Sequence, residues 1–293
     1  MDLFKGVGVA LVTPFKNGKV NYEKLEELIN FHIENKTDAI IILGTTGEAS
    51  TITEEEKMEI VLFSIKKANK KIPIIVGSGS NCTDSTISFS KFANDSGADG
   101  LLIVTPYYNK PSQKGLIAHY TKIAQEVDIP IIIYNVPSRT GVNILPHTVY
   151  ELSKVNNIKG IKEASGDIHQ ISKIIDICGK DFYVYSGNDD QLIPVLALGG
   201  SGVISVTANI IPGRISKIIK AFYNNDIVYA IAEALNLEKL HHSMFIETNP
   251  LPVKTAMNLM NMEVGELRLP LVEMDGKNID VLKQILKEYD LVW

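Results

Sequence analysis

Short apolar runs recur along the chain up to about residue 225, and each is followed by a longer segment with a different pattern. The runs are continuous and rich in valine, isoleucine and leucine, as expected for strands buried on both faces of a parallel sheet. We predict strands over Val7–Val12, Ala39–Leu43, Pro73–Val76, Leu101–Val104, Ile131–Tyr134, Gly160–Lys162, Tyr183–Tyr185 and Gly202–Ser205.

The segments between the apolar runs have helical periodicity and recognisable starting signals. Asn21 precedes apolar positions at helical spacing, Thr53 and Glu56 have the spacing of a capping box, and Pro146 suits a first helical turn. Repeated strand and helix units at this spacing are typical of a closed parallel barrel. The sequence therefore predicts an α/β fold, a TIM (β/α)8 barrel.

After Asn225 no further strand is predicted. Helices are expected over Asp226–Ile246, Pro252–Met260 and Asn278–Tyr289, with Pro250 and Gly265 as breaks. We therefore expect a catalytic barrel over residues 1–225 and a small C-terminal α-helical extension over residues 226–293. No linker of low complexity separates the two, so the extension is expected to pack on the barrel or on a partner.

Composition excludes several classes of function. The chain of 293 residues has a net charge of −5 and no run of basic residues, so a nucleic-acid partner is not expected. No apolar run approaches 18 residues and the N-terminus lacks a signal-peptide pattern, so we expect no membrane partner and a cytoplasmic location. Cys82 and Cys178 are too few for a disulfide framework.

In a barrel of this kind the carboxyl ends of the strands meet at one rim, where chemistry is placed. The turn Gly44-Thr45-Thr46-Gly47-Glu48 follows the second predicted strand and suits a small anion. Tyr107 and Tyr108 follow the fourth strand, Tyr134 ends the fifth and is followed by Arg139, and Lys162 ends the sixth. The rim thus offers an amine, phenols, hydroxyl groups and a guanidinium.

This inventory favours carbonyl chemistry. A free lysine amine has a pKa of about 10.4 and attacks a carbonyl only when burial or nearby charge favours its neutral form. At a barrel mouth Lys162 is a candidate nucleophile that condenses with a keto acid to an iminium and then an enamine. Tyr134 with Thr45 could move protons, and Arg139 could bind a carboxylate.

No metal or other cofactor is expected. Glu238 and His241 have a spacing found in carboxylate-bridged metal sites, but the sequence contains no second copy. Asp189 and Asp190 are interpreted as helix-cap carboxylates. Neither Gly6-Val7-Gly8 nor Gly77-Ser78-Gly79 has the third glycine of a dinucleotide fingerprint.

Five motifs in order resemble the dihydrodipicolinate synthase family, within the N-acetylneuraminate lyase and class I pyruvate aldolase superfamily. The similarity extends over essentially the whole chain. The motifs are Gly44-Thr45-Thr46-Gly47-Glu48, Tyr107-Tyr108, the segment 134–141 with sequence YNVPSRTG, Gly160-Ile161-Lys162-Glu163 and Gly202-Val203-Ile204-Ser205.

The resemblance implies an activity and a role for each residue. Pyruvate would condense with L-aspartate 4-semialdehyde to 4-hydroxy-tetrahydrodipicolinate, in the diaminopimelate route to lysine. Lys162 would form the Schiff base, with Tyr134, Thr45 and Tyr108 as a proton relay. Substrate binding is implied for Thr46, which would hold the pyruvate carboxylate, for Arg139, which would position the semialdehyde, and for Ile204 and Gly187.

Three alternatives stay open, of which one is an unrelated metal-dependent barrel hydrolase that would lose its activity with a chelator. N-acetylneuraminate lyase and the 2-keto-3-deoxy sugar acid aldolases share the fold, the lysine and the tyrosine, but generally lack an arginine at the position of Arg139. A non-catalytic barrel that binds a keto acid would use Lys162 only as a counter-ion. Such a barrel has no use for a lysine, a tyrosine and a hydroxyl group together at one rim.

The resemblance also bears on assembly and regulation. Family members usually lend the second of the paired tyrosines across a dimer interface, so Tyr108 implies a homodimer or a homotetramer built as a dimer of dimers. Ala49, Glu54, Lys57 and Ser85 stand where lysine-inhibited relatives carry serine, histidines and a glutamate. We therefore expect weak or absent feedback inhibition by lysine.

Overall fold

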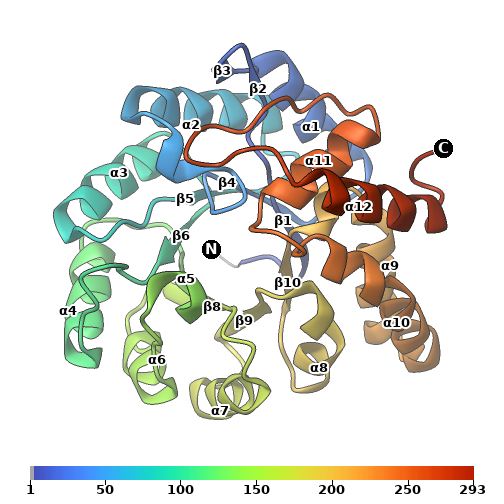
Figure 1. The fold of residues 1–293 in the computed structure, drawn as a ribbon. Coiled ribbons are helices and arrows are strands. Elements are labelled where there is room, and N and C mark those ends of the chain that lie inside the picture. Colours follow the sequence, from blue (N-terminus) through green and yellow to red (C-terminus); the bar gives the residue numbers. More distant parts are fainter. Residues whose placement is uncertain (1–2) are drawn as a thin grey trace.

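The computed structural model describes residues 3–293 as a closed barrel of parallel strands surrounded by helices (Figure 1). The strands are hydrogen-bonded in the order β1-β10-β9-β8-β7-β6-β5-β4, which closes the ring. The prediction of a TIM (β/α)8 barrel is therefore confirmed. The strands of the barrel are β1 (Gly6–Ala10), β4 (Ala39–Ile42), β5 (Ile74–Gly77), β6 (Gly100–Val104), β7 (Ile131–Asn135), β8 (Ile158–Glu163), β9 (Tyr183–Ser186) and β10 (Gly202–Ser205).

Every predicted strand is present, with shifts of a few residues at the ends. β1 stops at Ala10 rather than at Val12, and β8 runs from Ile158 to Glu163, longer at both ends than predicted. A small antiparallel hairpin that was not predicted, β2 (Phe15–Lys16) with β3 (Lys19–Val20), follows β1. Its strands are too short to produce a periodic pattern in the sequence.

The helices begin where the sequence predicted. The Asn21 side chain accepts a hydrogen bond from the backbone of Lys24, Thr53 and Glu56 form a reciprocal capping box, and Pro146 is the first residue of its helix. The helices up to the end of the barrel are α1 (Tyr22–Glu34), α2 (Glu54–Ala68), α3 (Thr83–Asp95), α4 (Gln113–Ala124), α5 (Pro137–Thr140), α6 (Pro146–Ser153), α7 (Ile168–Cys178), α8 (Leu192–Ala197) and α9 (Pro212–Tyr223). Three short 3-10 turns are η1 (Ala49–Thr51), η2 (Asp189–Gln191) and η3 (Thr207–Asn209).

Two hydrophobic cores result from the alternation of side chains along the strands. The larger core lies between the barrel and its helices. The smaller one fills the barrel, where the Phe4 and Tyr185 rings stack with centroids 4.5 Å apart and the Tyr185 hydroxyl donates to the Phe4 carbonyl. The barrel is therefore a packed core that supports chemistry only at its rim.

The last part of the chain is helical and lies against the barrel (Figure 1). Its helices are α10 (Ile227–Ser243), α11 (Leu251–Leu259) and α12 (Gly276–Glu288). The predicted boundary after Asn225 falls in the turn between α9 and α10, and the division into two parts stays a prediction. Within residues 3–293, no helix has the length and apolarity needed to cross a membrane.

Candidate active site

A cavity of about 670 Å³ opens at the carboxyl ends of strands β4 to β7. Thr45, Tyr107, Tyr134 and Arg139 contribute to its lining, as the sequence predicted for residues that follow these strands. The extension supplies a further wall that was not predicted. This wall consists of Thr248, Asn249, Pro250, Pro270 and Leu271.

Lys162 and Tyr134 are direct neighbours on adjacent strands, where they pair in the β7–β8 register. The Lys162 Nζ atom lies 4.4 Å from the centre of the Tyr134 ring. Both side chains are buried, with exposed fractions of 5% and 7%. A buried amine against a phenol ring that itself lines an open cavity has surroundings suited to Schiff-base chemistry.

The turn after β4 is fixed by hydrogen bonds along its whole length. The Gly47 and Glu48 amides donate to the carbonyls of Gly44 and Thr45 at 3.1 Å each, and the Thr13 hydroxyl donates to the Gly47 carbonyl at 2.7 Å. Thr45 lines the cavity and Thr46 is buried beside it. The turn thus presents hydroxyl groups at the cavity from a rigid backbone.

Asn249 connects Thr46 with Arg139. Its side-chain amide donates to the Thr46 Oγ1 atom, and its carbonyl accepts a hydrogen bond from the Arg139 guanidinium, both at 3.0 Å. The sequence analysis missed Asn249, because the extension was expected only to pack on the barrel. From the sequence, only the neighbouring Pro250 was interpreted, as a helix break.

Lys162 and Thr46 lie beside the residues that line the cavity, and three further predicted site residues lie away from its lining in this chain. Tyr108 is 91% exposed and has a left-handed backbone, so its ring points into solvent. Ile204 is completely buried in the barrel core. Gly187 lies where β8 and β9 approach closely, since a Cβ atom there would come within 2.5 Å of the Ala164 Cβ atom. That close approach explains why position 187 needs a glycine. The role of Gly187 in substrate binding stays a prediction.

A buried carboxylate lies directly behind Lys162. Glu163 is fully buried and accepts hydrogen bonds from the side-chain amides of Asn135 and Gln170 and from the Ser165 backbone. Burial raises the pKa of Glu163, and these hydrogen bonds oppose the rise only in part. These hydrogen bonds hold Glu163, the residue after Lys162, on the side of β8 that faces the surrounding helices.

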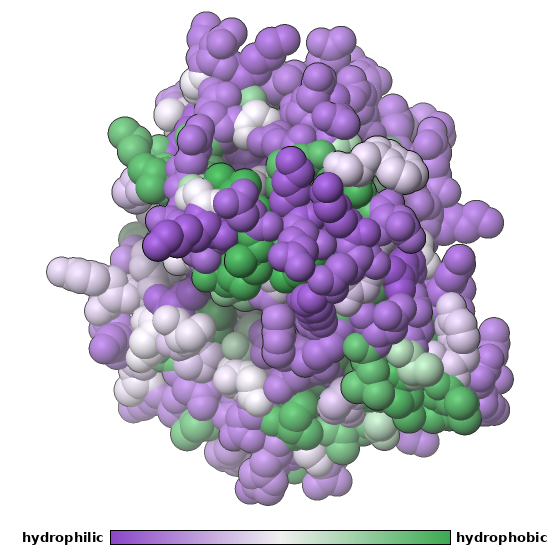
Figure 2. Space-filling view, turned by 45° about the vertical axis from the view of Figure 1, so that its right-hand side comes forward, coloured by the Kyte–Doolittle hydropathy of each residue, from purple (hydrophilic) through white to green (hydrophobic). Residues whose placement is uncertain are grey.

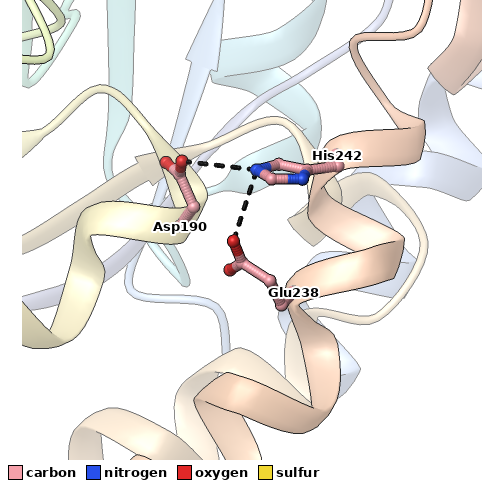
Figure 3. A group of neighbouring side chains, drawn as sticks. All are labelled: Asp190, Glu238 and His242. Atoms are coloured by element: carbon pink, nitrogen blue, oxygen red, sulfur yellow. Dashed lines mark ion pairs between the residues drawn. The ribbon is translucent and has the colours of Figure 1, made fainter.

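The residues considered for a metal lie apart from the cavity. Asp189 accepts hydrogen bonds from Val206 and Thr207 through one carboxylate oxygen, and His241 is buried against the Thr207 hydroxyl. Asp190, Glu238 and His242 instead form a surface group in which the His242 Nε2 atom lies 3.8 and 3.3 Å from the two carboxylates (Figure 3). Ion pairing across two neighbouring elements accounts for this arrangement.

The comparisons with known proteins agree with this geometry. The model of the dihydrodipicolinate synthetase family matches residues 3–289. The chain belongs to this family. A 4-hydroxy-tetrahydrodipicolinate synthase from Thermoanaerobacter sp. (strain X514) is 59% identical over 293 residues, which cover 100% of this chain and 99% of the relative.

Solved structures of dihydrodipicolinate synthases match over nearly the whole chain. The structure from Aquifex aeolicus superposes with a TM-score of 0.97 and 46% identity, covering 98% of this chain and 99% of that chain. A structure described as the first monomeric dihydrodipicolinate synthase variant has a TM-score of 0.97 and 44% identity, covering 99% and 98%. The family therefore includes at least one monomeric form.

The network behind Lys162 leads to a prediction on stability. Glu163→Gln places an amide group opposite the amide donors of Asn135 and Gln170, and we expect it to lower the free energy of unfolding at pH 7 by about 1–3 kcal/mol. Glu273→Gln, at an exposed position, should have no measurable effect. Urea unfolding of the two variants and the unaltered chain measures both values.

The pH dependence of the free energy of unfolding tests the Glu163 carboxyl group as well. Because its pKa is raised from the ordinary value of 4.5, folded Glu163 binds its proton more tightly than unfolded Glu163. The part of its stabilisation that comes from this tighter proton binding is therefore lost as the pH rises from 4.5 through the folded pKa, while the part that comes from the hydrogen bonds to the carboxylate remains at pH 7. The stability advantage over Glu163→Gln should shrink across this interval, and a constant difference would contradict the prediction.

Proposed function

We propose that the chain is a 4-hydroxy-tetrahydrodipicolinate synthase, a class I aldolase-type lyase that condenses pyruvate with L-aspartate 4-semialdehyde. The observation that carries this proposal is the buried Lys162 amine, 4.4 Å from the centre of the Tyr134 ring, which lines a cavity together with Thr45 and Arg139. The membership of the family supports it. A cytoplasmic location stays the prediction from the sequence.

The first half of the reaction needs a nucleophilic amine and proton transfer. The Lys162 nitrogen attacks the keto carbon of pyruvate, and the carbonyl oxygen leaves as water after it has gained two protons. The resulting iminium acidifies the neighbouring methyl group, which loses a proton to give an enamine. Tyr134 is the buried phenol next to the nitrogen, and we assign these proton transfers to Tyr134 with Thr45.

The second half joins two carbon atoms. The enamine carbon attacks the aldehyde carbon of the semialdehyde, whose oxygen takes up a proton and becomes a hydroxyl group. Attack of water or of the product's own amine on the carbon of the iminium that remains then breaks the bond to the Lys162 nitrogen and frees the lysine. We assign the pyruvate carboxylate to Thr46 and its turn, and the semialdehyde carboxylate to Arg139, since a guanidinium binds carboxylates in bidentate geometry. Arg139 also favours this substrate over the sugar aldehydes of the related lyases and aldolases.

We further propose that the chain assembles with copies of itself and that Tyr108 completes the site of a neighbouring chain. Its exposed ring supports this, because a catalytic phenol has no function in open solvent. Figure 2 shows a mostly hydrophilic face with a group of hydrophobic residues at its lower right. Ile227, Val228, Ile231 and Leu235 are exposed along α10, and a second copy would remove them from water. These features support a homodimer or a dimer of dimers.

The activity can be tested with a panel of aldehydes. Pyruvate consumption is measured with L-aspartate 4-semialdehyde, N-acetylmannosamine and D-glyceraldehyde, and we expect turnover only with the semialdehyde. Borohydride reduction with pyruvate should add a covalent mass at Lys162, and Lys162→Ala should abolish both signals because the nucleophile is gone. Turnover only with a sugar aldehyde, or no trapped adduct, would contradict the proposal.

Mixed oligomers test the role of Tyr108. Lys162→Ala and Tyr108→Phe chains, each nearly inactive alone, are unfolded together and refolded. A hybrid dimer then contains one site with an intact lysine and an intact tyrosine, so random pairing should restore about a quarter of normal activity. Lys162→Ala with Tyr134→Phe is the matched control. Tyr134 lies in the same site as Lys162, so this mixture should stay inactive.

The regulatory prediction concerns the outer part of the cavity, which Ala49, Glu54, Lys57 and Ser85 help to line. The Lys57 ammonium forms an ion pair with Glu54 at 2.6 Å, which offsets part of the repulsion that Lys57 would exert on a bound lysine. The expected insensitivity to L-lysine therefore depends mainly on Ser85, which offers no negative charge to an ammonium group.

We expect L-lysine to leave the initial rate almost unchanged, because this part of the cavity lacks a counter-charge at Ser85. Ser85→Glu should increase the sensitivity by supplying that charge. Initial rates with increasing L-lysine measure this, with D-lysine as the control for ionic strength. Inhibition of the unaltered chain at micromolar L-lysine would contradict the prediction.

A further inference from the structure

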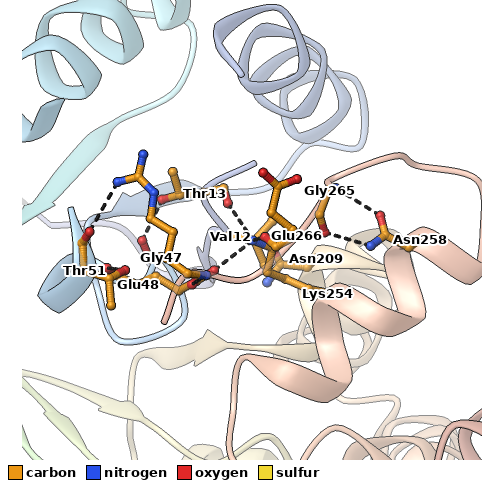
Figure 4. Close-up of polar contacts among 11 residues, drawn as sticks. Val12, Thr13, Gly47, Glu48, Thr51, Asn209, Lys254, Asn258, Gly265 and Glu266 are labelled. Carbon is orange, nitrogen blue, oxygen red and sulfur yellow. Dashed lines mark hydrogen bonds and ion pairs between the residues drawn. The ribbon is translucent and has the colours of Figure 1, made fainter. Parts of the chain in front are cut away.

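A buried lysine with no role in the reaction steps lies next to the site. Lys254, on α11, is 1% exposed. Its Nζ atom donates to the Glu48 carboxylate at 2.8 Å, to the Thr13 carbonyl at 3.1 Å and to the Glu266 carbonyl (Figure 4). All three protons of the ammonium group are thus used by fixed acceptors.

The carboxylate partner is the last residue of the turn that follows β4. Glu48 has a left-handed backbone with φ of 55°, which residues other than glycine rarely adopt, and its side chain is completely buried. Its second carboxylate oxygen accepts a hydrogen bond from the Arg268 amide at 3.1 Å. The surroundings therefore fix both the backbone and the side chain of Glu48.

The contacts of Lys254 reach both segments that hold the turn. Thr13 accepts from Lys254 through its carbonyl and donates through its hydroxyl to Gly47, while Glu48 lies one residue further along. Figure 4 shows the Lys254 side chain directed toward Glu48, near the segment that carries Thr13 and the turn that carries Gly47. A single ammonium group therefore ties the end of the Gly44–Glu48 turn to the segment after β1.

We propose that Lys254 is a positioning residue for pyruvate. By holding Glu48 and Thr13 it fixes the backbone of Gly44–Glu48, so that Thr45 and Thr46 present their hydroxyl groups to the pyruvate carboxylate in a constant geometry. The inference rests on the proposed function, because it assigns this turn to pyruvate. It attributes to the extension a role in substrate binding as well as in packing.

The alternative is that Lys254 only holds the extension in place, and Arg268 provides the matched comparison. The two cations lie over the same Phe15 ring, at 4.5 Å for Lys254 and 4.3 Å for Arg268. The Arg268 guanidinium forms a bidentate ion pair with Glu56 at the start of α2, whereas Lys254 bonds to the turn itself. Arg268→Met therefore removes a comparable contact of the extension and leaves the Lys254–Glu48 pair intact.

The experiment compares Lys254→Met, the double variant Lys254→Met/Glu48→Gln, and Arg268→Met in the full-length protein. The double variant is needed because Lys254→Met alone leaves Glu48 as an unpaired buried charge that can prevent folding. Two quantities are measured for each folded protein. These are the pyruvate concentration that half-saturates borohydride trapping on Lys162, and the KM for the semialdehyde.

We expect the half-saturating pyruvate concentration to rise about tenfold or more in the Lys254 variants, because small displacements of binding groups have large effects. The KM for the semialdehyde should change less than about twofold, since Arg139 does not contact Lys254. Arg268→Met should lower the melting temperature and leave the half-saturating pyruvate concentration unchanged.

The outcomes that follow contradict either the positioning role of Lys254 or the proposed function. A folded double variant with an unchanged half-saturating pyruvate concentration overturns the positioning role. So does a half-saturating pyruvate concentration that rises by the same factor as the KM for the semialdehyde, or that rises equally in Arg268→Met. An unaltered chain that forms no adduct with pyruvate overturns the proposed function, and this inference with it. Normal trapping in the unaltered chain separates the two failures.

Discussion

The pairing of β7 with β8 is the constraint on which the rest of the site depends. This register places Tyr134 beside Lys162 and Asn135 beside Glu163. Because successive side chains of a strand point to opposite faces, the lysine and the tyrosine face the barrel interior, while the amide and the carboxylate face the surrounding helices. A shift by one residue would exchange the two faces and bury the carboxylate inside the barrel. One register therefore sets both the reactive pair and its support.

Two carboxylates buried near this rim have fixed partners, as the low polarity of their surroundings demands. Glu163 is satisfied by amide donors, and Glu48 by Lys254 and the Arg268 backbone. Removing one partner of a buried ion pair costs about 3–5 kcal/mol, more than most surface contacts contribute. The extension, which supplies Lys254 and Arg268, is therefore energetically part of the barrel mouth even though it follows the last strand.

The sequence predicted the barrel and the position of the strand ends because both depend on local patterns. Continuous apolar runs define the strands, and the residues after them must lie at the rim once the barrel closes. The contact between Lys254 and Glu48 joins residues 206 positions apart, and no local periodicity reports it. The same holds for Asn249. The exposure of Tyr108 agrees with the family resemblance, which assigns this tyrosine to the site of a neighbouring chain, but no local pattern in the sequence indicates it.

Thr46 and Arg139, to which we assign the two substrate carboxylates, are both held by one residue of the extension. Asn249 bonds to Thr46 through its side-chain amide and to Arg139 through its backbone carbonyl, so each bond uses its own group. Five residues further on, Lys254 holds the end of the turn that carries Thr46. Because the Arg139 bond depends on the Asn249 backbone and not on the turn, the turn can lose its support from Lys254 while Arg139 keeps its partner. The extension thus supports the two proposed binding groups through separate contacts.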